Sequence, residues 1–154
     1  MSTPSERLAA LGLTLPPVAT PVAAYVPAMR TGSYVYTSGQ LPTVDGKLPA
    51  VGKVGDEVSA QDAAGMARTC ALNALAAAAS AAGGLEAIRR IVKVTGFVAS
   101  APGFGGQAQV INGASELLIE VFGEDGKHSR SAIGVAELPL NAPVEVELIA
   151  EVRD

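Results

Sequence analysis

The chain has 154 residues and a formal net charge of −4, with 49% hydrophobic and only 17% charged residues. Its basic residues are scattered, so no basic patch is available to neutralise a phosphate backbone, and nucleic acid is not expected as the main ligand. One cysteine, Cys70, and one histidine exclude an intrachain disulfide and argue against a structural zinc site.

The length fits one domain, and a domain of this size buries roughly 70% of the surface that its unfolded chain exposes. The N-terminal residues lack the basic start and apolar run of a signal peptide, and no stretch of about 18 apolar residues could span a membrane. We therefore expect a cytoplasmic protein without a membrane partner. A chain this apolar cannot easily bury all of its hydrophobic surface as a monomer, which indicates a homo-oligomer.

Residues 1–20 are expected to form an N-terminal arm, and residues 21–154 the main domain. The arm contains a short predicted helix that ends before Pro16 and Pro17. In chain order, the expected elements are a helix at 5–11, strands at 25–30 and 33–38, a helix at 59–82, a strand at 91–99, a helix at 106–122, and strands at 131–138 and 144–152.

The two long helices differ in pattern. The helix at 59–82 starts with a capping-box-like pair, Ser59 and Asp62, and its apolar residues form no single stripe, which is typical of a helix covered on two sides. The helix at 106–122 has one apolar face and is expected to pack that face on a sheet. The order β-β-α-β-α-β-β predicts an α+β domain of two layers, with both helices on one face of a mixed sheet.

Three stretches carry a resemblance to a known family. The first runs from Tyr25-Val26-Pro27 to residues 36–42 (Tyr-Thr-Ser-Gly-Gln-Leu-Pro), and the second is residues 92–98 (Val-Lys-Val-Thr-Gly-Phe-Val) followed by Asn112. The third is residues 129–139 (Ser-Arg-Ser-Ala-Ile-Gly-Val-Ala-Glu-Leu-Pro), followed by Val-Glu-Val-Glu at 144–147. In this order they resemble the YjgF/YER057c/UK114 family, also called Rid, in a longer subfamily with an N-terminal arm.

The resemblance implies a chorismate-mutase-like subunit that assembles into a homotrimer with sites in clefts between subunits. Many members hydrolyse reactive 2-imino and enamine acids, such as 2-aminoacrylate, to 2-oxo acids and ammonia, which removes damaging metabolites. They use no metal or organic cofactor.

Three residues match the family's catalytic positions. Arg130 is expected to anchor the substrate carboxylate, because a guanidinium grips a carboxylate through two hydrogen bonds and keeps its charge. Glu145 could move a proton for, or orient, the attacking water. Tyr25 could hold that water or the imine nitrogen, and the resemblance implies that Tyr25 and Arg130 come from neighbouring subunits.

Further residues are expected to line the substrate site: Ser38, Gly39, Gln40, Asn112, His128 and Ala132. Glycine at position 39 would let backbone approach a ligand closely. Asn112 is expected to have a structural role, such as a bond to backbone. His128 would add a titratable group to the cleft.

Ala132 departs from the family, since many members have cysteine two residues after the arginine. This excludes a thiol mechanism at that position, and mid-helix Cys70 is expected to be a small core residue that does not replace it. Hydrolysis by water remains the leading hypothesis. The alternatives are a trimeric protein that binds 2-oxo acids without catalysis and, with less support from the charge, an endoribonuclease.

Overall fold

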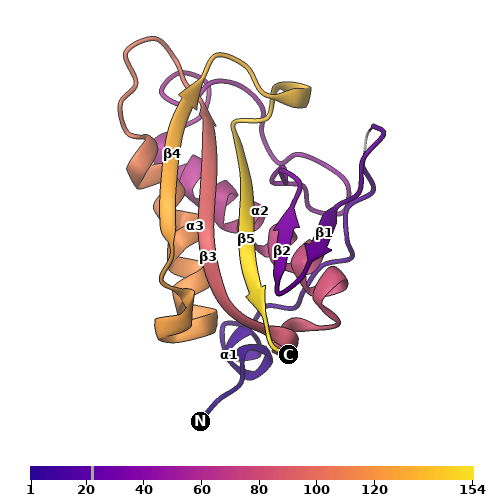
Figure 1. Ribbon diagram of the computed structural model, residues 1–154. Coiled ribbons are helices and arrows are strands. Elements are labelled where there is room, and N and C mark those ends of the chain that lie inside the picture. The colour runs from indigo at the N-terminus through magenta and orange to yellow at the C-terminus, as the bar shows by residue number, and fades with distance from the viewer. Residues whose placement is uncertain (22) are drawn as a thin grey trace.

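A five-stranded mixed sheet forms one layer of the molecule, and two long helices form the other (Figure 1). The computed structural model describes residues 1–21 and 23–154. The strands are β1 (Ala28–Thr31), β2 (Tyr34–Thr37), β3 (Ile88–Ala99), β4 (Ser129–Val135) and β5 (Val144–Val152). The helices are α1 (Pro4–Ala10), α2 (Ala60–Ala82) and α3 (Gln107–Phe122), with 3-10 turns η1 (Leu85–Ala87), η2 (Gly123–Gly126) and η3 (Pro139–Asn141).

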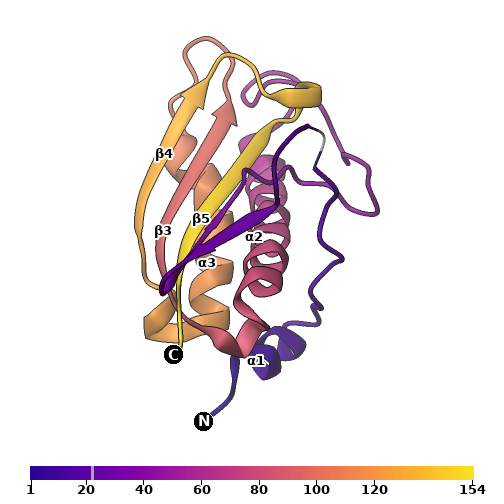
Figure 2. The same ribbon diagram turned by 45° about the vertical axis from the view of Figure 1, so that its right-hand side comes forward.

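The sheet runs in the order β1-β2-β5-β3-β4, so the last strand of the chain lies at its centre. β5 pairs antiparallel with both β2 and β3, whereas β3 and β4 are parallel and are connected through α3. A parallel pair needs such a crossover, because a tight turn can join only antiparallel strands. Figure 2 shows α2 and α3 together on one face. The predicted α+β class and element order are confirmed.

The ends of α2 follow the predicted signals. The Ser59 side chain accepts a hydrogen bond from the backbone N–H of Asp62, and Gly83 ends the helix in the left-handed conformation at φ 97°. The alanine and leucine residues at positions 74–79 are buried, because α2 packs against both the sheet and α3. This confirms the expected cover on two sides. No helix in the described ranges is long and apolar enough to cross a membrane.

Several strand limits differ from the predicted ones. The strand expected at 25–30 begins only at Ala28, after a bend at residues 23–25 and after Pro27, which has no N–H to donate to a ladder. β4 is shifted toward the N-terminus, to Ser129–Val135, because its partner β3 extends from Ile88 and pairs with it from Lys93 onward. Parallel pairing, which depends on residues distant in sequence, thus sets the limits of β4.

The face of the sheet away from the helices is partly apolar and open. Met29, Tyr34, Tyr36 and Ile133 project from it and are all exposed. On β2 the alternate residues Val35 and Thr37 are buried on the side of the helices. Exposed apolar side chains gathered on one sheet face are typical of an interaction surface.

The N-terminal arm packs along the helical layer. Leu8 of α1 is buried in the main core cluster, and the Ser5 backbone N–H and hydroxyl both donate to the Glu86 carboxylate, at 2.9 and 2.8 Å. Figure 2 shows the chain after α1 passing beside α2 toward the opposite end of the molecule. The arm therefore reaches the end of the sheet at which β5 begins.

The close approach of α2 and α3 depends on Gly113. A Cβ at this position would clash with the backbone oxygen of Ala64. G113A should therefore lower the free energy of unfolding by roughly 1–3 kcal/mol, because the helices must move apart. G65A is the matched control: its Cβ meets nothing within 4 Å, so the higher helix propensity of alanine should stabilise by up to about 1 kcal/mol. Urea unfolding of both variants checks this, and equal effects of the two would contradict the packing account.

Candidate functional site

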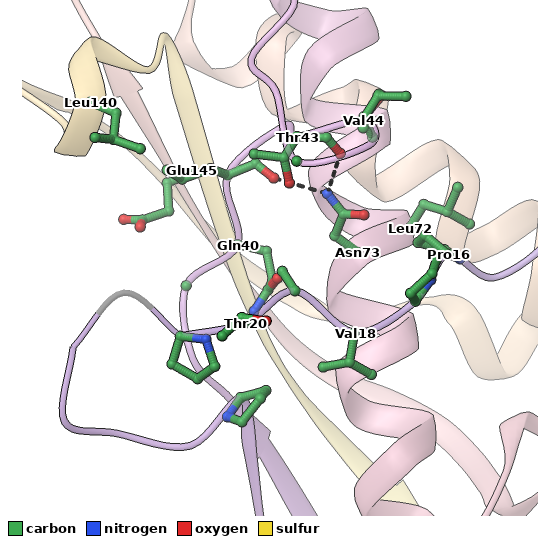
Figure 3. Close-up of a pocket in the computed structure, with 18 of the residues that line it drawn as sticks. Pro16, Val18, Thr20, Gln40, Thr43, Val44, Leu72, Asn73, Leu140 and Glu145 are labelled. Atoms are coloured by element: carbon green, nitrogen blue, oxygen red, sulfur yellow. Dashed lines mark hydrogen bonds between the residues drawn. The ribbon is translucent and has the colours of Figure 1, made fainter.

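A pocket of about 600 Å³ opens beside the start of β5 (Figure 3). The arm at residues 16–21 forms one wall, and the loop at residues 39–46 forms another. The pocket extends from Glu145 on β5 to Leu72 on α2. We call this cavity the Glu145 pocket.

Glu145 lies on the open face of β5, opposite the buried side chains of Val144 and Val146. Its carboxyl packs against the backbone of Gly39, where an added Cβ would lie 2.8 Å from the carboxyl carbon. Partial burial raises the pKa of the Glu145 carboxyl above its ordinary value, and the nearby charge of Glu147 raises it further. A carboxyl group with a raised pKa takes up a proton more readily than an ordinary glutamate, which suits it to proton transfer.

Three of the other predicted residues lie at or near this pocket. Tyr25 lines it and is exposed, and Gln40 lines it while its backbone pairs with Val146 in a short bridge. Ser38 does not line it: its hydroxyl donates to the Val26 carbonyl at 2.6 Å. Ser38 thus fastens the segment that carries Tyr25 to the end of β2.

Arg130 lies elsewhere, on the face of β4 that is turned toward α3. Its guanidinium donates to the Asn112 side-chain oxygen at 2.8 Å, to the Ser115 hydroxyl at 3.2 Å and to the Ala108 carbonyl at 3.3 Å. Within the described part of the chain, no carboxylate forms an ion pair with Arg130. The side chain is therefore oriented by neutral acceptors, and its positive charge stays available to an anion. The side-chain oxygen of Asn112 thus accepts from a side chain, whereas a bond to backbone was the example of a structural role expected from the sequence.

His128 extends the same network. Its Nδ1 lies 2.7 Å from the Gly126 carbonyl oxygen and its Nε2 lies 2.8 Å from the Ser115 hydroxyl. Because a carbonyl oxygen only accepts, Nδ1 carries the proton and Nε2 of the neutral ring accepts from Ser115. Burial lowers the pKa of His128, and the charge of Arg130 lowers it further. We call Arg130, Asn112, Ser115 and His128 the Arg130 cluster.

Within one chain, the Arg130 cluster and the Glu145 pocket are separate. β3 lies between β4 and β5, so the two strands are about 10 Å apart. Arg130 pairs with buried Val94 and faces the helices, whereas Glu145 pairs with Phe97 and faces away from them. Ala132 lies on the same side of β4 as Arg130, since alternate residues of a strand share a face.

Cys70 is no part of either group. Its thiol is fully buried next to the Val144 carbonyl, and burial raises its pKa well above the ordinary value, as expected for a core cysteine. Among residues 1–21 and 23–154, no three His, Cys, Asp or Glu side chains gather where they could hold a metal ion.

Several contributors were missed from the sequence. Ser115 joins Arg130 to His128, and its place one helical turn after Asn112 was a usable signal. Asn73 donates both amide hydrogens to the Leu41 and Thr43 carbonyls, at 3.0 Å each, and so fixes a loop of the Glu145 pocket. Nothing local in the sequence indicates that contact, because it joins residues about 30 positions apart.

The chain is thus a two-layer α+β domain with an oriented arginine on one edge strand of the sheet and a half-buried carboxyl in a pocket. A family model described as "YjgF/chorismate mutase-like, putative endoribonuclease" matches residues 5–152. The chain therefore belongs to the YjgF/Rid family.

Similar proteins match nearly the whole chain. Protein TCP17 of Trypanosoma cruzi is 40% identical over 97% of this chain and 94% of its own. The crystal structure of a protein of unknown function from Agrobacterium tumefaciens is 46% identical, with a TM-score of 0.90 over 97% and 92% of the two chains. Escherichia coli TdcF with bound serine is 30% identical, with a TM-score of 0.60 over 91% and 94%.

Because its pKa is raised by partial burial, the charged Glu145 carboxylate destabilises the folded state at neutral pH. Because the pKa of Glu145 is higher in the folded than in the unfolded chain, the protonated carboxyl contributes to the free energy of unfolding. This contribution is present below pH 4.5 and is lost as the pH rises through the folded pKa. E145Q should therefore melt at a higher temperature than the natural protein at pH 7.5, and the difference should shrink toward pH 4. Melting curves from pH 4 to 8 test this, with E116Q as the control for the change in charge. A difference that does not vary with pH would contradict the assignment.

The lowered pKa of His128 gives the stability of the fold the opposite pH dependence to that given by Glu145. The unfolded chain protonates this imidazole more readily than the folded chain does. The contribution of the neutral ring to the free energy of unfolding is therefore present above pH 6.5 and is lost as the pH falls through the folded pKa. The natural protein should therefore lose more stability than H128Q between pH 7.5 and pH 5. Denaturant unfolding at several pH values measures both, and parallel curves would show that His128 is not held in the neutral form.

Proposed function

We propose that the protein hydrolyses 2-imino and enamine acids, such as 2-aminoacrylate, to 2-oxo acids and ammonia. The observation that carries this proposal is Arg130, which is oriented by three neutral acceptors and has no ion-pair partner in the described chain. A guanidinium held in this way can grip a carboxylate through two parallel hydrogen bonds. Membership of the YjgF/Rid family supports the reaction type.

Glu145 would handle the protons of the reaction. Protonation of the enamine at carbon by the Glu145 carboxyl gives the iminium ion, and water then adds to the iminium carbon with transfer of one of its protons to the Glu145 carboxylate. The same carboxyl passes this proton to the nitrogen, the C–N bond breaks, and ammonia leaves while the hydroxyl proton returns to Glu145 and the 2-oxo group forms. The raised pKa of Glu145 suits both directions of transfer. These imines already hydrolyse in water, so orientation supplies most of the required acceleration.

A complete site would need two copies of the chain. The Glu145 pocket holds Tyr25 and Gly39, whereas Arg130 lies on the opposite side of the sheet, two strands away. We propose that the copies associate as a homotrimer, so that the Arg130 cluster of one copy faces the Glu145 pocket of the next. The exposed apolar side chains on the open sheet face support association.

A second candidate function is binding of 2-oxo acids without turnover. TdcF was crystallised with serine bound, which shows that a related protein binds a small amino acid. Ala132 also leaves this chain without the thiol that many family members carry two residues after the arginine. The binding function uses the same anchor and the same pocket and differs only in the absence of proton transfer.

Endoribonuclease activity is named in the family description but has less support here. The net charge is −4, and the Glu145 pocket is lined by two acidic and no basic side chains among the described residues. Both features would repel an RNA backbone.

A competition assay tests the deaminase proposal. An enzyme that releases 2-aminoacrylate is mixed with semicarbazide, and the rate of trapping is followed with and without this protein. The protein should lower the trapping rate, and R130A should reduce kcat/KM by on the order of a hundredfold, because a charge-assisted anchor is lost.

R68A is the matched control for this substitution. Arg68 pairs with Glu120 between α2 and α3, outside both groups, so its loss removes the same charge without touching the proposed site. Activity of R68A should stay within twofold of the natural protein. An unchanged trapping rate with several imines would refute the deaminase function, and full activity of R130A would refute the role of the anchor.

A further inference from the structure

The Glu145 pocket is far larger than the smallest imine requires. A three-carbon amino acid displaces only a few water volumes of roughly 30 Å³ each, whereas the pocket encloses about 600 Å³. Cavities of this size accommodate ligands much larger than 2-aminoacrylate. Most of the space therefore lies beyond the reacting atoms, on the side bounded by the arm.

The wall on that side is apolar and poor in hydrogen-bond donors. Pro16 and Val18 of the arm lie beside Leu72 of α2, and Leu140 of η3 lies at the opposite end (Figure 3). Pro16 and Pro17 have no backbone N–H, and their rings fix φ, so this wall is both apolar and stiff. Such a surface favours a hydrocarbon group over a polar one.

The charges around the pocket exclude an anionic side chain. Asp45 and Glu145 are the charged residues among its described lining, and no Lys, Arg or His joins them. Asn73 offers no free donor, because its amide hydrogens are bound to the Leu41 and Thr43 carbonyls. The carboxylate of a ligand must therefore be held outside the pocket, and the group that enters carries no negative charge.

We infer that the arm converts this pocket into a subsite for a large apolar side chain, so that the preferred ligands are 2-imino and 2-oxo acids derived from residues such as leucine or phenylalanine. The inference rests on the proposed function only in placing the reacting carbon next to Glu145. Residues 16–18 of the arm then determine which side chain is preferred. Glu145 and Arg130 act on the 2-imino or 2-oxo carboxylate group that all such acids share.

Calorimetric titration with stable 2-oxo acids tests the subsite without requiring turnover. Each buried CH₂ adds about fourfold in affinity, so 4-methyl-2-oxopentanoate should bind at least tenfold tighter than pyruvate. 2-Oxoglutarate should bind more weakly than 4-methyl-2-oxopentanoate, because its second carboxylate would enter an acidic, apolar cavity. The natural protein in its own oligomeric state is used throughout.

V18D supplies the test of the arm. Val18 is exposed, so the change should leave the fold intact while it places a charge in the wall, and the tenfold preference for 4-methyl-2-oxopentanoate should fall to about twofold or less. V51D is the matched control at an exposed valine outside the pocket, and its preference should equal that of the natural protein. Melting curves establish that both variants fold.

The outcomes separate this inference from the proposed function. If the protein prefers the apolar acid, V18D loses this preference and no imine hydrolysis is detected, the subsite is supported and catalysis is refuted. If imines are hydrolysed but pyruvate and 4-methyl-2-oxopentanoate bind with equal affinity, catalysis is supported and the subsite is overturned. A preference that survives V18D, or a pocket filled by a neighbouring copy, would also overturn the subsite.

Discussion

The separation of Arg130 from Glu145 is the constraint on which the proposed site depends. Side chains of a strand alternate between the two faces of a sheet, and the register places Arg130 opposite buried Val94 and Glu145 opposite Phe97. No rotamer of either side chain can bring the two charges together through β3. In the proposed function, one chain therefore carries two incomplete sites, a basic one at the edge next to α3 and an acidic one beside the arm.

Each incomplete site is supported by contacts that also stabilise the fold. Asn112 and Ser115 orient the guanidinium, and the neutral ring of His128 completes the hydrogen bonding of the Ser115 hydroxyl. On the other side, the missing side chain of Gly39 gives Glu145 room to pack against backbone. The raised pKa of Glu145 reflects a stability cost, which is typical of a position kept for chemistry more than for folding.

Local signals in the sequence were sufficient for the helices and for β5. The cap at Ser59, the left-handed glycine at Gly83 and the strict alternation of residues 144–152 all predict the observed elements. The limits of β4 and the late start of β1 were not predictable in this way, since pairing with distant strands determines them. The motif around Arg130 identified the family and suggested Arg130 as an anchor, but it did not indicate the strand order that separates this residue from Glu145. The path of the arm into the pocket likewise depends on contacts between distant residues.

Subunit complementation tests most directly whether two copies build the site. R130A and E145Q each remove one half, and their co-expression produces mixed oligomers in which some interfaces join an intact Arg130 to an intact Glu145. For a trimer with random mixing, about one quarter of the interfaces are restored, so imine hydrolysis should recover to about a quarter of the natural activity. Activity no higher than that of the two variants measured separately would show that the two residues do not act across a shared interface.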